Sequence, residues 1–361
     1  MASFRLSIGA LVGVLLVVAL GAPLAVADES SNVYHQIALI TVPGNALNSF
    51  DISFVERSSQ EYFLADRSNA GVDEIDGGTN AFLHRFGGFV GFSGANETSG
   101  PNGVTVAHDR HELWATDGDS SVRVFDLKTN GFVARIPTGG TKRADEIAYD
   151  VRDHSVLVAN DADDPPFVTF IDVDSREVVG TVSFPNATNG LEQPVWDPET
   201  HRFYLSVPQL GSNPLHGGIA VLDPRTKTLD RVFPVENCQP AGLALGPDQD
   251  LALGCSGDAI DAGAAPQTQI MDARSGAILK VITQVGGSDE VWFNPGDKRF
   301  YVAARSMPGG PVLGVIDAES NTWITNVPTG PNAHSVAADP INNHIFVPVR
   351  GRGILVFDQV E

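Results

Sequence analysis

Val122-Arg123-Val124-Phe125-Asp126-Leu127-Lys128-Thr129 alternates apolar and polar residues, reaches an Asp and places a hydroxyl three residues later. Alternation of this kind is typical of a β-strand with one buried face. An Asp carboxylate accepts hydrogen bonds from backbone N–H groups two or three residues further on, and the Thr hydroxyl closes the same turn. The stretch therefore predicts a strand that ends in a tight turn at Asp126, where the next strand begins.

The same pattern recurs along the whole chain. Successive Asp positions lie 50, 46, 51, 49, 45 and 41 residues apart. A period in this range, built from short strands and turns, is typical of four-stranded propeller blades. We therefore predict an all-β, seven-bladed β-propeller in which these Asp residues close turns and take no part in catalysis. The other copies are Ile75-Asp76 with Thr79, Ile171-Asp172 with Ser175, Leu222-Asp223 with Thr226, Met271-Asp272 with Ser275, Ile316-Asp317 with Ser320, and Phe357-Asp358.

The two ends of the chain are predicted to share one blade. Residues 35–44 resemble the outer strands that follow the Asp turns, such as residues 132–139. The last repeat stops three residues after Asp358 and so lacks its outer strand. We expect the N-terminal segment to supply it, which closes the ring and removes an open sheet edge.

The first 27 residues have the features of a secretory signal peptide. Arg5 is followed by an apolar run over residues 11–20 and by Ala25-Val26-Ala27 before Asp28. The run is too short for a membrane span, and no basic stop-transfer flank follows it, which favours a cleaved signal over an uncleaved anchor. We expect a periplasmic or secreted protein in which residues 28–361 form one propeller domain.

The chain is acidic, with a net charge of −21. Loss of residues 1–27 would remove Arg5 and no acidic residue, which makes the charge −22. Such a charge excludes binding to nucleic acid or anionic lipid through a general positive field. The expected partners are a small-molecule ligand or a protein at the propeller rim, with no nucleic acid and no membrane span.

Cys238 and Cys255 are the only cysteines, and both fall in one repeat. The hairpin between them turns near Gly246-Pro247, which places them opposite one another. In an oxidising compartment we expect a disulfide, and a loop of about 15 residues closed in this way stabilises the fold by roughly 3 kcal/mol. Two separate buried thiols are the alternative.

Four segments of one repeat resemble the YVTN (YncE-like) repeat of secreted bacterial propellers. They are Pro101-Asn102-Gly103-Val104-Thr105-Val106, Leu113-Trp114-Ala115-Thr116-Asp117, Val122-Arg123-Val124-Phe125-Asp126 and Ile136-Pro137-Thr138-Gly139. Related patterns cover nearly the whole chain after residue 28. The resemblance implies a propeller fold with a binding role.

The candidate site lies where the inner strands begin, because these strands surround the central channel. We expect inner strands to start at Ile52, Val104, Ile147, Pro194, Leu243, Val291 and Val336. Two residues ahead of each start, at the channel mouth, are Phe50, Asn102, Asp145, Glu192, Ala241, Asp289 and His334. The neighbouring positions add Asp51, Glu146, Gln193, Glu290 and Ser335.

Carboxylates that converge on one axis repel one another, by roughly 4 kcal/mol per pair at 4 Å and an effective dielectric near 20. A divalent cation would relieve this repulsion, and oxygen ligands favour calcium or magnesium over zinc or copper. The alternative is that polar residues at a wet channel mouth are simply solvated. We take calcium as the expected cofactor, with Asn102, Asp145, Glu192 and Asp289 as its ligands.

A second resemblance supports this metal hypothesis. Glu192-Gln193-Pro194-Val195-Trp196 is similar to the Glu-x-Pro-x-Trp motif of the gluconolactonase/senescence-marker (SMP-30) family, and Asn102-Gly103-Val104 is similar to its Asn-Gly ligand segment. The resemblance implies a catalytic cation held by Glu192 and Asn102. Asp145 and Asp289 match only as acids at the same strand position. That family has six blades and the opposite order of the two motifs.

Two functions from different classes follow. The first is metal-dependent hydrolysis of a lactone or ester, in which the cation polarises a carbonyl and Asp289 or His334 accepts the proton. The second is a non-catalytic binding or protein-interaction propeller. The sequence leaves both open. The long connectors at residues 209–218 and 258–266 are candidates to border the mouth.

Overall fold

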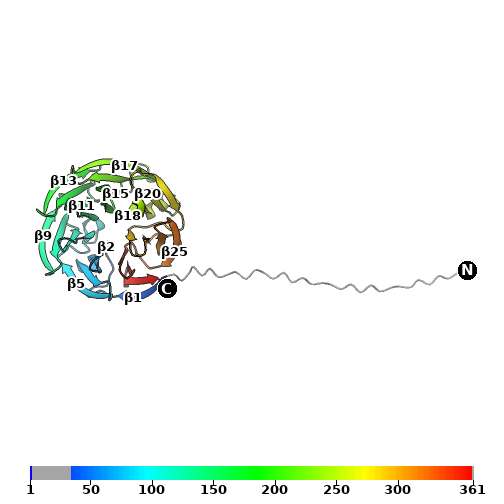
Figure 1. Cartoon of the computed structure of the whole chain (residues 1–361), viewed down its shortest axis with the longest axis horizontal. Helices are drawn as coiled ribbons and strands as arrows, with labels where there is room; N and C mark the ends of the chain where they lie inside the picture. The colour runs from blue at the N-terminus through cyan, green and yellow to red at the C-terminus, as the bar shows by residue number, and fades with distance from the viewer. Residues whose placement is uncertain (2–33, 360–361) are drawn as a thin grey trace. The chain divides into compact units, whose positions relative to one another are not determined.

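The computed structural model describes Met1 and residues 34–359, and over residues 34–359 the chain forms a seven-bladed β-propeller (Figure 1). The predicted signal peptide, apart from Met1, lies outside the described residues. Seven antiparallel four-stranded sheets follow one another around a ring. The first strand of each blade faces the centre, and the fourth, such as β9, β13 and β17, lies at the circumference (Figure 1). The predicted fold class is confirmed.

The strands of each blade follow the order of the chain. Blade 1 consists of β2 Ser53–Glu56, β3 Glu61–Asp66, β4 Gly71–Asp76 and β5 Ala81–Gly87; blade 2 of β6 Val104–Ala107, β7 Glu112–Asp117, β8 Ser121–Asp126 and β9 Gly131–Pro137. Blade 3 consists of β10 Ile147–Asp150, β11 Ser155–Asn160, β12 Phe167–Asp172 and β13 Glu177–Ser183; blade 4 of β14 Pro194–Asp197, β15 Arg202–Val207, β16 His216–Asp223 and β17 Thr228–Glu236. Blade 5 consists of β18 Pro240–Leu245, β19 Asp250–Cys255, β20 Thr268–Asp272 and β21 Ile278–Ile282; blade 6 of β22 Val291–Asn294, β23 Arg299–Ala304, β24 Val312–Asp317 and β25 Thr322–Pro328; blade 7 of β26 Ala337–Ala338, β27 Ile345–Val349, β28 Gly353–Gln359 and β1 Tyr34–Ile40.

Six of the seven predicted Asp turns form, and the seventh residue, Asp358, lies within β28 near the end of the chain. Asp126 Oδ1 accepts hydrogen bonds from the N–H groups of Lys128 at 2.9 Å and Thr129 at 2.8 Å, and from the Thr129 hydroxyl at 3.0 Å. Because strands alternate in direction, all these turns lie on the face of the ring opposite the starts of the inner strands. The equivalent turns are held by Asp76, Asp172, Asp223, Asp272 and Asp317.

The ring closes through the pairing of its two chain ends. Strand β1 runs antiparallel to β28, from Tyr34 opposite Gln359 to Ile40 opposite Ile354. This confirms the predicted N-terminal outer strand. Large side chains such as Trp114, Tyr62 and Tyr204 are fully buried between adjacent blades. Burial of each large apolar side chain contributes on the order of 1.5–3 kcal/mol.

Cys238 and Cys255 form a disulfide, as predicted, but the register differs from the expected one. Leu243 pairs with Leu253, and after a shift Pro240 pairs with Cys255. Cys238 therefore precedes β18 and reaches Cys255 from a bend in which Asn237 and Gln239 have positive φ angles. A bulge of this kind shifts the pairing of the two strands. Counting residues from the turn assumes an unbroken pairing and therefore misses the shift.

Most inner strands begin within one residue of the predicted positions, but Leu243 lies inside β18, which begins at Pro240. Blade 5 also carries the α-helix α1, Gly257–Asp261, in the connector between β19 and β20. Short 3-10 turns occur at Arg67–Asn69, Asn96–Thr98 and Pro247–Gln249. Within the described part of the chain, no helix is long and apolar enough to cross a membrane.

Candidate functional site

A cavity of about 330 Å³ lies at the channel mouth, on the face where the inner strands begin. Most of the side chains that the sequence placed at the mouth line this cavity. Asn102 is fully buried and does not line it, and Ala241 lines a second cavity beside it. The lining residues that were predicted are Phe50, Asp51, Asp145, Glu146, Glu192, Asp289 and His334.

A second ring of mouth residues was missed by the sequence analysis. The residue directly after the second strand of every blade lies at the same face, because that strand runs back to the mouth. Three of these residues are arginines, and they come from the neighbouring blades 6, 7 and 1. In blade order from 1 to 7 the residues are Arg67, Gly118, Asp161, Pro208, Ser256, Arg305 and Arg350. These residues could have been found from the sequence, because each lies at the same distance along the chain from the start of its predicted second strand.

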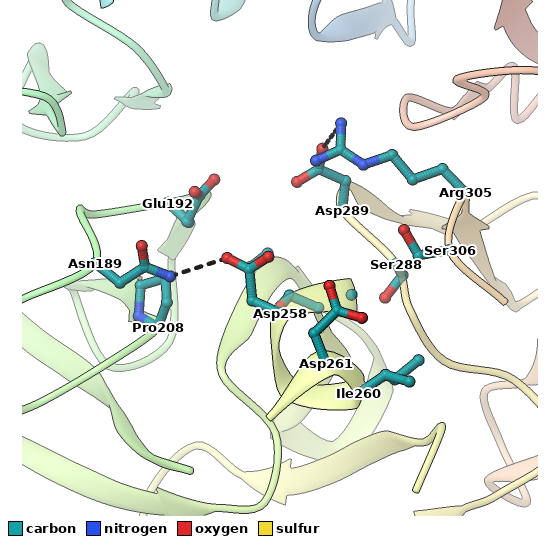
Figure 2. Close-up of a pocket in the computed structure, with 13 residues that line it drawn as sticks. Asn189, Glu192, Pro208, Asp258, Ile260, Asp261, Ser288, Asp289, Arg305 and Ser306 are labelled. Carbon is teal, nitrogen blue, oxygen red and sulfur yellow. Dashed lines mark hydrogen bonds and ion pairs between the residues drawn. The ribbon is translucent and has the colours of Figure 1, made fainter. Parts of the chain in front are cut away.

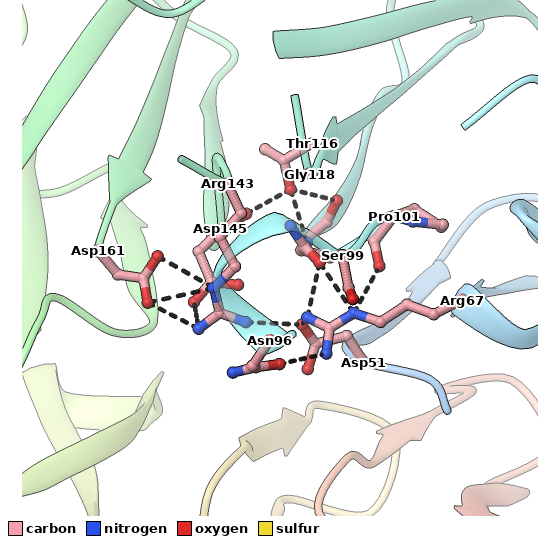
Figure 3. Close-up of polar contacts among 12 residues, drawn as sticks. Asp51, Arg67, Asn96, Ser99, Pro101, Thr116, Gly118, Arg143, Asp145 and Asp161 are labelled. Carbon is pink, nitrogen blue, oxygen red and sulfur yellow. Dashed lines mark hydrogen bonds and ion pairs between the residues drawn. The ribbon is translucent and has the colours of Figure 1, made fainter. Parts of the chain in front are cut away.

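Arg67 lies against Asp51 (Figure 3) and also contacts Asn102. Its Nε and Nη2 donate hydrogen bonds to Asn102 Oδ1 at 2.9 and 2.6 Å, and its Nη2 also pairs with Asp51. Asn102 Nδ2 donates to the carbonyl of Ala144 at 2.6 Å. The side chain of Asn102 is therefore used in full by the protein itself.

Arg143 contacts three carboxylates, one of which, Asp51, it shares with Arg67 (Figure 3). Its Nη2 lies 2.8 Å from Asp145 Oδ2 and 2.7 Å from Asp161 Oδ2, and its Nη1 lies 3.7 Å from Asp51 Oδ2. Burial alone would lower the pKa of Arg143, but the charges of these three carboxylates outweigh burial and raise it well above its usual value. For Asp51 the balance has the opposite sign. Burial would raise the pKa of Asp51, but Arg67, His334 and Arg143 together lower it.

His334 has a partner at each ring nitrogen. Nδ1 lies 2.9 Å from the carbonyl oxygen of Asn332, and Nε2 lies 3.3 Å from Asp51 Oδ1. The ring stacks on Phe50 with centroids 4.8 Å apart. Asp289, the other residue predicted to accept a proton, pairs with Arg305 at 2.9 Å. The catalytic roles of Asp289 and His334 stay predictions.

Glu146 and Glu192 differ from the other acids of the mouth because neither is paired within the described residues. Glu146 is only 5% exposed, yet it lines the cavity. Burial, followed by the charges of Asp145, Glu290 and Glu192, raises the pKa of Glu146 well above its usual value. Burial and the charge of Asp289 do the same to the pKa of Glu192. Both carboxyls line the cavity and accept no hydrogen bond from another described residue.

The residues directly after Glu192 and Asp289 bond to other blades. Gln193 Oε1 accepts hydrogen bonds from the N–H groups of Leu243 in blade 5 at 2.7 Å and Val291 in blade 6 at 3.2 Å. Glu290 accepts from the Ser335 hydroxyl at 2.5 Å and from the Val336 N–H at 2.9 Å. These contacts join the inner strands of blades 4 to 7.

A smaller cavity of about 160 Å³ adjoins the first and shares Glu192, Asp289 and Arg305 with it. Figure 2 shows Glu192 on one side and the Asp289–Arg305 pair on the other, with Asp258 and Asp261 of α1 nearby. The predicted connector at residues 258–266 therefore borders the mouth through α1. Asn189 anchors it with a hydrogen bond of 3.1 Å to Asp258.

Three of the four predicted metal ligands, Asp145, Glu192 and Asp289, line one cavity, and Asn102 does not. Over residues 34–359, no group of three or more His, Cys, Asp or Glu side chains is arranged to hold a metal ion. The countercharge that the acids require comes instead from Arg67, Arg143 and Arg305. Calcium binding stays a prediction.

Comparison with known proteins supports the fold and no finer assignment. No protein-family model and no curated protein sequence matches the chain. A chain from a crystal structure of the mitotic checkpoint complex is similar, with a TM-score of 0.70 and 15% identity over 96% of this chain and 98% of that one. A chain of Kuenenia stuttgartiensis hydrazine synthase has a TM-score of 0.69 and 14% identity over 90% of this chain and 99% of that one. At these identities the likeness shows a β-propeller alone.

Proposed function

We propose that this protein is an exported binding propeller that holds a small polar molecule in the cavity at its channel mouth. The observation that carries the proposal is Glu146, a carboxyl that is 5% exposed, lines the cavity and has no partner among the described residues. The carboxyl oxygens of Glu146 reach the cavity, where no group of residues 34–359 donates to them. A ligand that donates to Glu146 would supply the hydrogen bonds that these residues do not provide.

The size and lining of the cavity support a small-molecule ligand. Its volume of about 330 Å³ is at the lower end of the range for small-molecule sites, roughly 300–1,000 Å³. Charged and polar side chains line most of it, and Phe92 stands at its rim with 61% exposure. The similar chain from the mitotic checkpoint complex is itself part of a complex. A protein partner at the rim is therefore compatible with a ligand in the mouth.

Metal-dependent hydrolysis of a lactone or ester stays the second candidate, because Glu192 and Asp289 line both cavities. The arginines weaken the electrostatic argument for a cation, since guanidinium groups already offset the carboxylate charges. Each ring nitrogen of His334 lies against an acceptor oxygen, so the ring would have to leave one of these contacts to present a nitrogen to a substrate.

The test is the thermal midpoint of residues 28–361 with a panel of amino acids, amines, carboxylic acids and sugars. A ligand at 100 times its dissociation constant stabilises the native state by about 2.7 kcal/mol, which a melting curve resolves. We expect one class to raise the midpoint, and Glu146→Gln to reduce that rise while Arg225→Gln, on the opposite face, retains it. A panel without effect on the wild-type protein contradicts the proposal.

The second candidate is tested in the same assay. Calcium is added to the chelator-stripped protein, and a rise in the midpoint that disappears in Glu192→Ala would support a metal site. Turnover of a lactone panel with calcium, lost in Asp289→Ala, would then support hydrolysis. Ligand binding without turnover in either form supports the binding propeller.

A further inference from the structure

The charges at the mouth are distributed unevenly around the ring. Blades 6, 7 and 1 supply Arg305, Arg350 and Arg67. Blades 3 and 4 supply Glu146 and Glu192. Asp51 and Asp289 also lie on the first side and Arg143 lies on the second, but each of these three is ion-paired within the protein.

Only some of these charges are available to a ligand. Arg67 and Arg143 are buried and bonded to Asp51, Asn102, Asp145 and Asp161. Arg305 has one partner, Asp289, and its side chain is 43% exposed. Arg350 is exposed at the cavity and forms no ion pair with another described residue. The available donors are thus Arg305 and Arg350.

The available acceptors lie on the other side. The side chains of Glu146 and Glu192 make no hydrogen bond within residues 34–359, and the charge of Glu192 is one of those that raise the pKa of Glu146. An ammonium group offers three donors and a compensating charge, so it suits two neighbouring carboxylates. A neutral hydroxyl would satisfy one hydrogen bond but leave the charges unbalanced.

We propose that the ligand of the mouth cavity is a small zwitterion, with an ammonium group at Glu146 and Glu192 and a carboxylate at Arg305 and Arg350. This inference rests on the proposed binding function and adds the class and the orientation of the ligand. Guanidinium groups bind carboxylates through paired hydrogen bonds, which orients the anionic end. The exposed ring of Phe92 at the rim can cover the apolar part of such a molecule.

The ammonium end makes binding depend on pH in a defined direction. Burial and the charges of neighbouring acids raise the pKa of both Glu146 and Glu192, which favours their protonated forms. An ammonium group binds to the carboxylate form, so any proton that these groups hold must leave on binding. Affinity for the zwitterion should therefore rise with pH until both groups are ionised or the ligand loses its own ammonium proton.

Titration calorimetry with matched probes tests the proposal. The zwitterions are glycine, 4-aminobutanoate and 6-aminohexanoate, which differ in the distance between their charges; the single-charge controls are butylamine and butanoate. We expect one zwitterion to bind roughly tenfold or more tightly than either control, because each control loses one set of charged hydrogen bonds. Equal binding of butylamine, or of butanoate, and the best zwitterion overturns the proposal.

Two variants test the orientation. Glu192→Gln should weaken binding of the zwitterion and butylamine and leave butanoate unchanged. Arg350→Gln should do the reverse, with loss of zwitterion and butanoate binding and no change for butylamine. Arg225→Gln, an exposed arginine of the opposite face that pairs with Asp153, is the matched control and should bind all probes as the wild type does.

The two proposals fail in different ways. If no zwitterion binds but a sugar or another neutral compound raises the thermal midpoint through Glu146, the zwitterion proposal is overturned and the binding function stands. If no compound of any class acts, both are overturned. If Glu192→Gln and Arg350→Gln affect all probes alike, the assigned orientation is wrong.

Discussion

Arg67 donates two hydrogen bonds to Asn102 Oδ1, from Nε at 2.9 Å and from Nη2 at 2.6 Å. Asn102 was a predicted calcium ligand, and its amide oxygen is occupied by a guanidinium group. The same arginine pairs with Asp51. The guanidinium group of Arg67 thus occupies the Asn102 oxygen that the sequence assigned to a calcium ion.

Loss of this arginine should be costly. Arg67→Met would leave Asp51 and Asn102 buried without their main partner. Removal of one member of a buried ion pair typically costs about 3–5 kcal/mol. We expect a loss of that order in the free energy of unfolding from urea curves. Arg225→Gln, which breaks an exposed pair, should leave the urea midpoint unchanged; an equal loss in both variants would contradict this account.

The disulfide gives a second stability prediction. Cys238 and Cys255 are separated by 17 positions, and a loop of this size is worth roughly 3 kcal/mol in the chain-entropy model. The double variant Cys238→Ala/Cys255→Ala should be less stable by about that amount. A reducing agent should lower the urea midpoint of the wild type and have no effect on the double variant. An effect on both would point to a cause other than this bond.

The fold could be predicted because its signals are local. An Asp and a hydroxyl three residues apart define six turns, and these six together with Asp358 repeat at a spacing that defines the ring. The mouth acids could also be placed, because their offset from the inner strands is constant.

The partners of these acids could not be placed so readily. Arg143 comes from the loop between blades 2 and 3 and joins Asp51 of blade 1 to Asp161 of blade 3. Such contacts depend on how far a side chain extends between blades. The repeat pattern of the sequence carries no information about that distance. Arg67, Arg305 and Arg350 are different, because each directly follows the second strand of its blade. This constant position could have been used to predict that they lie at the mouth.

Glu146 should make stability depend on pH. Its pKa in the folded protein is raised by burial and by neighbouring acids, and in the unfolded chain it is about 4.3. The folded state therefore binds more protons, so stability should fall as pH rises from the unfolded pKa through the folded one. Glu146→Gln removes this dependence. Urea midpoints between pH 5 and 9 should diverge, with the variant increasingly more stable than the wild type; parallel curves would contradict the assignment.

Arg143 provides the sharpest test of whether guanidinium groups replace a metal at the mouth. It lies within 4 Å of carboxylate oxygens of Asp51, Asp145 and Asp161. Arg143→Ala would leave these three acids without their shared countercharge, and oxygen ligands in such a group favour calcium. We expect calcium to raise the thermal midpoint of Arg143→Ala and to leave that of the wild type unchanged. A response in the wild type that Arg143→Ala does not enlarge would instead favour a native metal site at Glu192 and Asp289.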